Sequence, residues 1–290
     1  MAVARWTAEA ADRFTRANVR VEHALHERAM FGDEALAALL DRYPRERLGV
    51  FTMGEDPEDW GSWRRGEAGD LTGAELLAEV RAGRLWLNLR AVNANDAAYA
   101  ALSDEIFAEV EKATGRRCLK RDLGLLISSP KAQVFYHFDS PLVMLWQLRG
   151  RKRVWVYPPE RPFLSDEQVE RLVLGEAAEQ VPYDRAWDHA AEVFDLEPGH
   201  MVSWPQNAPH RVENGDMLNL SLSIEFMTPE ALLKANVAYA NGLLRKTLGR
   251  APAKVPVLAK AAMAYAHKLM RRAPRAKFLP AAFRLGRQLG

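Results

Sequence analysis

The sequence contains a single cysteine, Cys118, among its 290 residues. This excludes an intramolecular disulfide framework and any zinc site built from several cysteines. No apolar run approaches the roughly 18 residues that a membrane-spanning helix needs. The N-terminus lacks the apolar core of a signal peptide, and no glycine-rich phosphate-binding loop is present. We therefore expect a soluble cytoplasmic protein.

Acidic residues are almost absent from the last part of the chain. Residues 229–290 hold 13 Lys and Arg but one acid, Glu230, which gives a net charge of +12. The whole chain has 40 basic and 38 acidic residues, so residues 1–228 carry 27 and 37, a net charge of −10. We expect this basic tail to pack on the acidic body, to form a homodimer through its helices, or to bind an anionic partner such as nucleic acid, an acidic protein or anionic lipid.

Hydrophobic periodicity divides the chain into three regions. Residues 1–115 are predicted to be mostly helical, with at least one strand that feeds the next region. Residues 116–228 contain many short strands separated by tight turns, which favours an antiparallel barrel or sandwich. The predicted helices are residues 33–43, 72–82, 97–113 and 165–175. The predicted strands are residues 84–90, 123–128, 133–138, 142–148, 153–157, 192–196, 201–204 and 217–226.

Residues 229–290 are predicted to be helical again, as a C-terminal extension that prolines cut into about three pieces. The middle piece has an apolar stripe and basic residues outside it, which predicts an amphipathic helix with a basic outer face. The stripe consists of Leu258, Ala262, Tyr265 and Leu269, and the basic residues are Lys260, Lys268 and Arg271.

Three residues have the pattern of a metal site. Residues i and i+2 of an extended chain point to the same face, so His137 and Asp139 can converge on one point. His210 follows 71 residues after Asp139, near the end of another predicted strand, and a closed barrel can bring such a strand end beside the first pair. Two imidazoles and one carboxylate are the facial triad of non-haem Fe(II) oxygenases, which leaves coordination positions open. Taken alone, a His-x-Asp pair is common and is more often structural.

The surrounding sequence resembles a known family. Residues 136–159, YHFDSPLVMLWQLRGRKRVWVYPP, are similar to the iron-binding segment of cupin-like (JmjC-type) Fe(II)/2-oxoglutarate-dependent oxygenases, with the asparaginyl-hydroxylase branch the most similar. That branch has His-x-Asp, then Gln-x-Lys-Gly-x-Lys-Arg and a hydrophobic run that ends in Pro-Pro. Residues 198–214 are similar to its Pro-Gly…Pro…His-x-Val-Glu-Asn ending. The resemblance covers roughly residues 116–228.

This resemblance implies a double-stranded β-helix (jelly-roll or cupin fold) flanked by N-terminal helices and the C-terminal helical extension. His137, Asp139 and His210 would bind Fe(II), and Lys152 would pair with the distal carboxylate of the co-substrate 2-oxoglutarate. The enzyme would hydroxylate a C–H bond of a protein or peptide side chain, or of a small molecule, and release succinate and CO₂. The charge agrees with this role for Lys152, because a buried carboxylate needs a cation.

Two residues depart from the pattern of that branch. Val134 stands where the branch has a threonine whose hydroxyl contacts the co-substrate, and Glu225 stands near a usual asparagine. These departures leave open a cupin-like binding or regulatory protein with little or no turnover. A zinc or manganese cupin isomerase is a weaker alternative, since such sites usually have more histidines and a glutamate.

Other candidate residues have a weaker pattern. His23 and His26 are three residues apart and could share a helical face, but no third ligand is near them in the sequence, so we expect a structural role. The tryptophans are expected to lie mostly in the core, although Trp60 and Trp63 could line the mouth of a substrate pocket.

Overall fold

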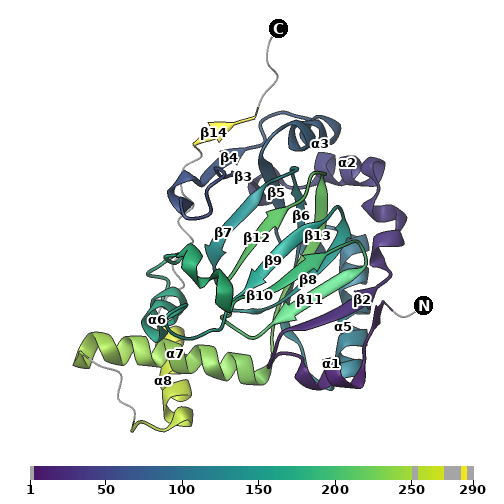
Figure 1. The fold of residues 1–290 in the computed structure, drawn as a ribbon. Coiled ribbons are helices and arrows are strands. Elements are labelled where there is room, and N and C mark those ends of the chain that lie inside the picture. The colour runs from purple at the N-terminus through teal and green to yellow at the C-terminus, as the bar shows by residue number, and fades with distance from the viewer. Residues whose placement is uncertain (1–2, 250–253, 271–281, 286–290) are drawn as a thin grey trace.

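The strands of the computed structural model, which describes residues 3–249, 254–270 and 282–285, form two sheets (Figure 1). One has ten strands in the order β1-β2-β11-β8-β13-β6-β5-β3-β4-β14, and the other has four in the order β10-β9-β12-β7. The strands are β1 (Ala4–Arg5), β2 (Val19–His23), β3 (Leu48–Thr52), β4 (Arg64–Glu67), β5 (Leu85–Leu89), β6 (Leu119–Ser128), β7 (Gln133–His137), β8 (Leu142–Arg149), β9 (Lys152–Val156), β10 (Glu192–Leu196), β11 (His200–Trp204), β12 (His210–Asn214), β13 (Asn219–Met227) and β14 (Phe283–Arg284).

Helices cover one face of the ten-stranded sheet and lie below the four-stranded sheet in the view of Figure 1. They are α1 (Ala8–Arg13), α2 (Asp33–Arg42), α3 (Gly73–Ala82), α4 (Val92–Asn95), α5 (Ala97–Thr114), α6 (Asp166–Val173), α7 (Pro229–Leu248) and α8 (Val257–Met270). Local sequence explains their ends. Thr72 and Glu75 form a capping box at the start of α3, and Gly115 ends α5 with a left-handed backbone, φ 64°. No described helix is long and apolar enough to cross a membrane.

Strand β8 shows how the core is divided between the two sheets. Its residues are apolar on both faces, because successive side chains point to opposite sides of a strand and both sides are covered here. Met144, Trp146 and Leu148 belong to the main core, which also contains residues of the helices. Val143 and Leu145 pack with residues of β9 and β11 in a second core between the two sheets. The layer between the sheets is therefore the closed interior of the molecule.

The N-terminal region contributes more strands than the one predicted at residues 84–90. Strands β5, β3 and β4 continue the ten-stranded sheet outward from β6, while β2 and β1 extend it beyond β11. Two of these strands are too short to give a clear sequence pattern: β1 has two residues, and β2, with alternating buried and exposed residues, has five. Residues 1–115 therefore build both flanks of the large sheet in addition to its helical cover.

The orientation predicted for the middle piece of the tail is wrong. A helix forms there, α8, but Leu258, Tyr265 and Leu269 are 76%, 64% and 70% exposed, while Lys260 is 8% exposed. Helix α8 instead packs on α7 through Ala264 and its neighbours. The prediction assumed that the more apolar stripe must be the covered one, whereas the small Ala264 allows the opposite face to approach α7. Arg271 lies outside the described residues.

The tail also docks on the acidic body of its own chain. Arg245 of α7 binds Glu170 of α6 at 2.6 Å, and the neighbouring Lys246 pairs with Glu176. Residues 283–284 form β14, parallel to β4, rather than a helix, and Arg284 pairs with Asp70 at 3.2 Å. The opposite charges of body and tail thus meet within one chain.

Arg245→Met is expected to lower the free energy of unfolding by about 3 kcal/mol, because it leaves the Glu170 carboxylate, whose side chain is 3% exposed, without its cation. The matched control is Lys246→Met, whose ion pair is far more exposed and should cost less than about 1 kcal/mol. Urea denaturation of both variants measures the difference. Equal effects would show that burial of Glu170 does not determine how tightly the tail is held.

Candidate metal centre

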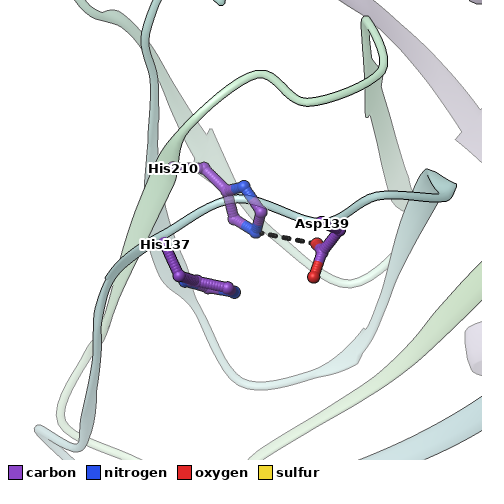
Figure 2. Close-up of side chains that lie close together, drawn as sticks. All are labelled: His137, Asp139 and His210. Atoms are coloured by element: carbon purple, nitrogen blue, oxygen red, sulfur yellow. Dashed lines mark ion pairs between the residues drawn. The ribbon is translucent and has the colours of Figure 1, made fainter. Parts of the chain in front are cut away.

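The pairing of β7 with β12 brings the two histidines together. His137 is the last residue of β7 and His210 is the first residue of β12, and the two are direct partners across the antiparallel pair. Asp139 follows β7 after one intervening residue, on the connection to β8. Figure 2 shows the three side chains converging on one point. The structure thus places together the three residues that the sequence predicted as metal ligands.

Both imidazole rings are held in the tautomer that a metal requires. His137 Nδ1 lies 2.8 Å from the carbonyl oxygen of Phe135, and His210 Nδ1 lies 3.1 Å from that of Ala208. Because a carbonyl oxygen can only accept, each Nδ1 must carry the proton and donate it. Nε2 is then the unprotonated nitrogen in both neutral rings, free to bind a metal. This backbone support is typical of histidines that ligate metals.

The distances suit a shared cation. One ligand atom from each of His137, Asp139 and His210 lies within 4.8 Å of the others. His210 Nε2 is 3.4 Å from Asp139 Oδ2, and the two imidazole centroids are 4.2 Å apart. Among the described residues, no other group of His, Cys, Asp and Glu has this geometry.

Burial makes these groups unfavourable as charged species when no cation is near. Desolvation, reinforced by His137, holds the pKa of His210 well below its ordinary value. Desolvation also raises the pKa of Asp139, although His137 and Arg90 act in the opposite direction. A divalent cation would compensate the carboxylate and use both neutral imidazoles, so the residues fit such an ion. Two nitrogens and one oxygen on one side of the ion leave open positions, as in the 2-His-1-carboxylate site.

Lys152 projects into a cavity between the two sheets. It is the first residue of β9, it is 6% exposed, and burial alone lowers the pKa of its ammonium to about 7. Its direct partner on β12 is Asn214, which lies four residues beyond His210. Lys152 is therefore about 13 Å from His210, measured along the strand direction. The residues that line this cavity are Trp86, Leu126, Ser128, Ala132, Gln133, Val134, Leu145, Lys152, Val212 and Asn214.

Two acidic residues lie beside the triad: Glu225, which the sequence singled out as a departure from the family pattern, and Glu179, which had no signal in the sequence. The backbone N–H of Phe138 donates to the backbone carbonyl of Glu179, whose side chain interacts electrostatically with Asp139. Glu225, on β13, is half-buried near both, and its pKa is raised by desolvation first and then by Asp139 and Glu179. Arg90 is the nearby cation. Glu179 lies in a connection 40 residues beyond Asp139, so only the tertiary fold brings it close.

An aromatic cluster lies on another side of the histidines. The ring of Phe135 is 5.3 Å from that of His137, and Trp63 packs edge-to-face on Phe135 at 6.1 Å. Trp63 also stacks on Phe51 at 5.5 Å. Trp63 thus packs among aromatic side chains near His137, and its place at the mouth of a substrate pocket stays a prediction.

His23 and His26 do not share a helical face as the sequence suggested. His23 belongs to strand β2, and its Nδ1 accepts a hydrogen bond from the backbone N–H of Leu25 at 3.1 Å. Its ring packs on Trp146 at 5.1 Å, so it is a core residue. Apolar and charged residues alternate over residues 19–22, and this pattern would have predicted a strand here.

The fold is similar to solved structures, although two comparisons of the sequence found no match. No protein-family model matches this chain, and no curated sequence matches it. The chain is similar to the X-ray structure of Escherichia coli YcfD, with a TM-score of 0.54 and 17% identity over 93% of this chain and 70% of that one. A second structure, of the E. coli ribosomal oxygenase YcfD, gives 0.52 and 20% identity, with 92% and 68% covered. At such identity the likeness shows the fold.

His210→Ala is expected to weaken Co(II) binding by at least about 100-fold, because it removes one of three ligands. Equilibrium dialysis and the visible absorption of bound Co(II) measure this. His189→Ala, which changes an exposed histidine, should bind Co(II) as the wild type does. Unchanged binding to the His210 variant would place the metal elsewhere.

Proposed function

We propose that this protein is an Fe(II)- and 2-oxoglutarate-dependent dioxygenase built on a double-stranded β-helix. Strands β6 to β13 support this fold, because the chain passes back and forth between two sheets, with β9 and β10 as a hairpin in the small one: β6, β13, β8 and β11 lie in the large sheet and β7, β12, β9 and β10 in the small sheet. This is the arrangement of an eight-stranded jelly roll. The similar E. coli fold belongs to a ribosomal oxygenase, which supports an oxygenase reaction.

One observation carries the proposal: two Nε2 atoms and one carboxylate converge at one end of a closed interior that also contains Lys152, which has no charged partner among the described residues. Fe(II) bound there would supply the activation of O₂ that hydroxylation of a C–H bond requires. His137 and His210 would hold the ion through Nε2, with their rings oriented by backbone carbonyls. Lys152 would attract the second carboxylate of 2-oxoglutarate.

The protein itself would orient the reactants and exclude water. Aromatic residues, including Tyr136, Phe138 and Tyr157, form a buried cluster around the strand that carries His137, which keeps that side of the site dry. The acidic residues Glu179 and Glu225 and the aromatic Trp63 flank the triad and would contact the substrate. We propose a side chain of a protein or peptide as substrate, with a small molecule as the second possibility.

The test is anaerobic addition of Fe(II) and 2-oxoglutarate to the purified protein. We expect a visible metal-to-ligand charge-transfer band, followed by stoichiometric succinate when O₂ is admitted. His137→Ala should abolish the band because it removes a ligand, and Lys152→Ala should raise the 2-oxoglutarate concentration needed for it. His189→Ala is the matched control, with an unchanged band.

The alternatives give different results in the same experiment. A band without succinate would favour a cupin-like binding or regulatory protein, and the departures Val134 and Glu225 are the observations that favour it. Folded protein with neither band nor succinate would contradict the proposal. Turnover supported by zinc or manganese without 2-oxoglutarate would favour a cupin isomerase.

We also propose that the C-terminal helices form a homodimer. The exposed residues Leu258, Tyr265 and Leu269 of α8 support this, because their spacing of seven and four residues makes one continuous apolar seam. An anionic partner for the basic tail is the alternative, although Arg245, Lys246 and Arg284 already pair within the chain. A cytoplasmic location remains a prediction.

Replacing Leu258 and Leu269 together by Glu is expected to convert a dimer into a monomer, because two charges would enter each copy of the seam. Light scattering after size-exclusion chromatography measures the mass. A wild-type monomer, or a dimer that persists in the variant, would contradict a dimer through α8.

A further inference from the structure

One carboxylate fastens the long connection between β9 and β10, residues 157–191, to the small sheet. Asp188 accepts hydrogen bonds from the hydroxyls of Tyr157 and Tyr183 and from Arg211 Nη2, the last at 2.6 Å. Burial alone would raise the pKa of Asp188, but its three donors lower it below the ordinary value. The carboxylate therefore stays charged and joins two parts of the connection to strand β12.

These bonds lie on the face of the small sheet that points away from the large one. Val212, the neighbour of Arg211, packs in the core between the sheets, and successive side chains of a strand point to opposite faces. On the outer face Arg211 is 6% exposed, and its guanidinium carbon lies 3.4 Å from the centre of the Trp155 ring. An ion pair in such a place is costly to break, because one charge would be left buried without a partner.

Two of the donors hold the chain on either side of His210. Tyr157 donates its backbone N–H to the carbonyl oxygen of Pro209 at 2.8 Å, and its hydroxyl accepts a hydrogen bond from Arg211 Nε at 3.2 Å. Pro209 and Arg211 are the residues before and after His210. Asp188 binds both Tyr157 and Arg211. It therefore fixes, from the outer face of the sheet, the backbone that carries the His210 imidazole.

The connection also contacts the strand that carries His137. Tyr183 stacks its ring on that of Tyr136, with the centroids 5.2 Å apart, and Tyr136 is the residue before His137. Gln180, three residues before Tyr183, forms an isolated antiparallel bridge with His137. At the level of His137, strand β7 thus has β12 on one side and the connection on the other.

The backbone between His137 and Asp139 is held by the same connection. Phe138 separates these two candidate ligands and is fully buried. Its backbone N–H donates to the carbonyl oxygen of Glu179 at 3.3 Å. All three candidate ligands therefore lie next to residues that the connection contacts.

We propose that Asp188 is a positioning residue for the candidate metal centre. Through Tyr157, Tyr183 and Arg211 it holds the connection against the two segments that carry the candidate ligands. This inference rests on the proposed function, because it assigns Asp188 a role in the geometry of the metal ligands. A residue that only stabilised the fold would change the free energy of unfolding and leave the coordination of a bound metal unaltered.

The test is a Co(II) titration of the full-length Asp188→Asn variant, without turnover. Asparagine has nearly the same shape, but its amide nitrogen would face the Arg211 guanidinium, and two donors cannot bind each other. We expect Co(II) to bind about tenfold more weakly, at the lower end for residues that orient metal ligands, and the visible absorption of the bound ion to change. Equilibrium dialysis measures the affinity, and absorption at saturation reports the ligand geometry, both on protein that circular dichroism shows to be folded.

The matched control is Asp195→Asn. Asp195 also accepts two hydrogen bonds from an arginine of the same sheet, Arg153, at 2.6 and 2.9 Å. It lies on β10, the edge strand farthest from β7, so the affinity and the spectrum should equal those of the wild type.

A double variant, Asp188→Asn with Arg211→Met, separates the cost of an unpaired charge from the loss of positioning. Removing the buried cation should restore much of the free energy of unfolding that Asp188→Asn loses. The affinity and the spectrum should stay altered, because the bond between the connection and the residue after His210 is still missing.

Wild-type affinity and spectrum in folded Asp188→Asn, or their recovery in the double variant, would overturn the inference and leave the proposed function standing. If Asp188→Asn does not fold, Tyr183→Phe removes one hydroxyl and keeps the ion pair. It should change the spectrum of bound Co(II) in folded protein, and an unchanged spectrum there would overturn the inference. Failure of the wild type to bind Co(II) would overturn both the inference and the proposed function.

Discussion

The register between β7 and β12 is the constraint on which the rest of the site depends. It sets His210 opposite His137, and a shift of one residue would turn one imidazole to the other face of the sheet. The same strand β12 pairs with β9 on its other side, so its register also sets Asn214 opposite Lys152. One short strand thus sets the positions of the two candidate metal-binding histidines relative to each other and to Lys152.

Burial changes the pKa values of the side chains at these positions. The interior between the sheets removes Asp139, His210 and Lys152 from water, and burial shifts the pKa of each toward its neutral form. A metal ion at one end and an anion at the other would reverse those costs. The same burial would keep water from the reacting atoms.

The C-terminal extension contacts the rest of the chain through ion pairs and one small residue. Its basic residues meet acidic residues of the body at the surface, and its helix α8 packs through a small residue, Ala264, rather than through its apolar stripe. A monomer rarely exposes a continuous apolar seam without a use for it. The extension therefore combines contacts that hold it to its own chain with an exposed apolar seam on α8.

The sequence by itself determined the strand-rich core, the main helices with their caps, and the pair His137 and Asp139, because these depend on periods of two or 3.6 residues and on neighbours in the chain. His210 could be joined to this pair only by expecting a closed barrel, and Lys152 was found through resemblance to a family. Only the tertiary structure decided the rest: that Glu179 lies beside the site, that His23 lies in a strand, and which face of α8 is covered. The physical reason is that these features depend on contacts between residues far apart in the chain. Local periodicity does not determine which distant residues a side chain contacts.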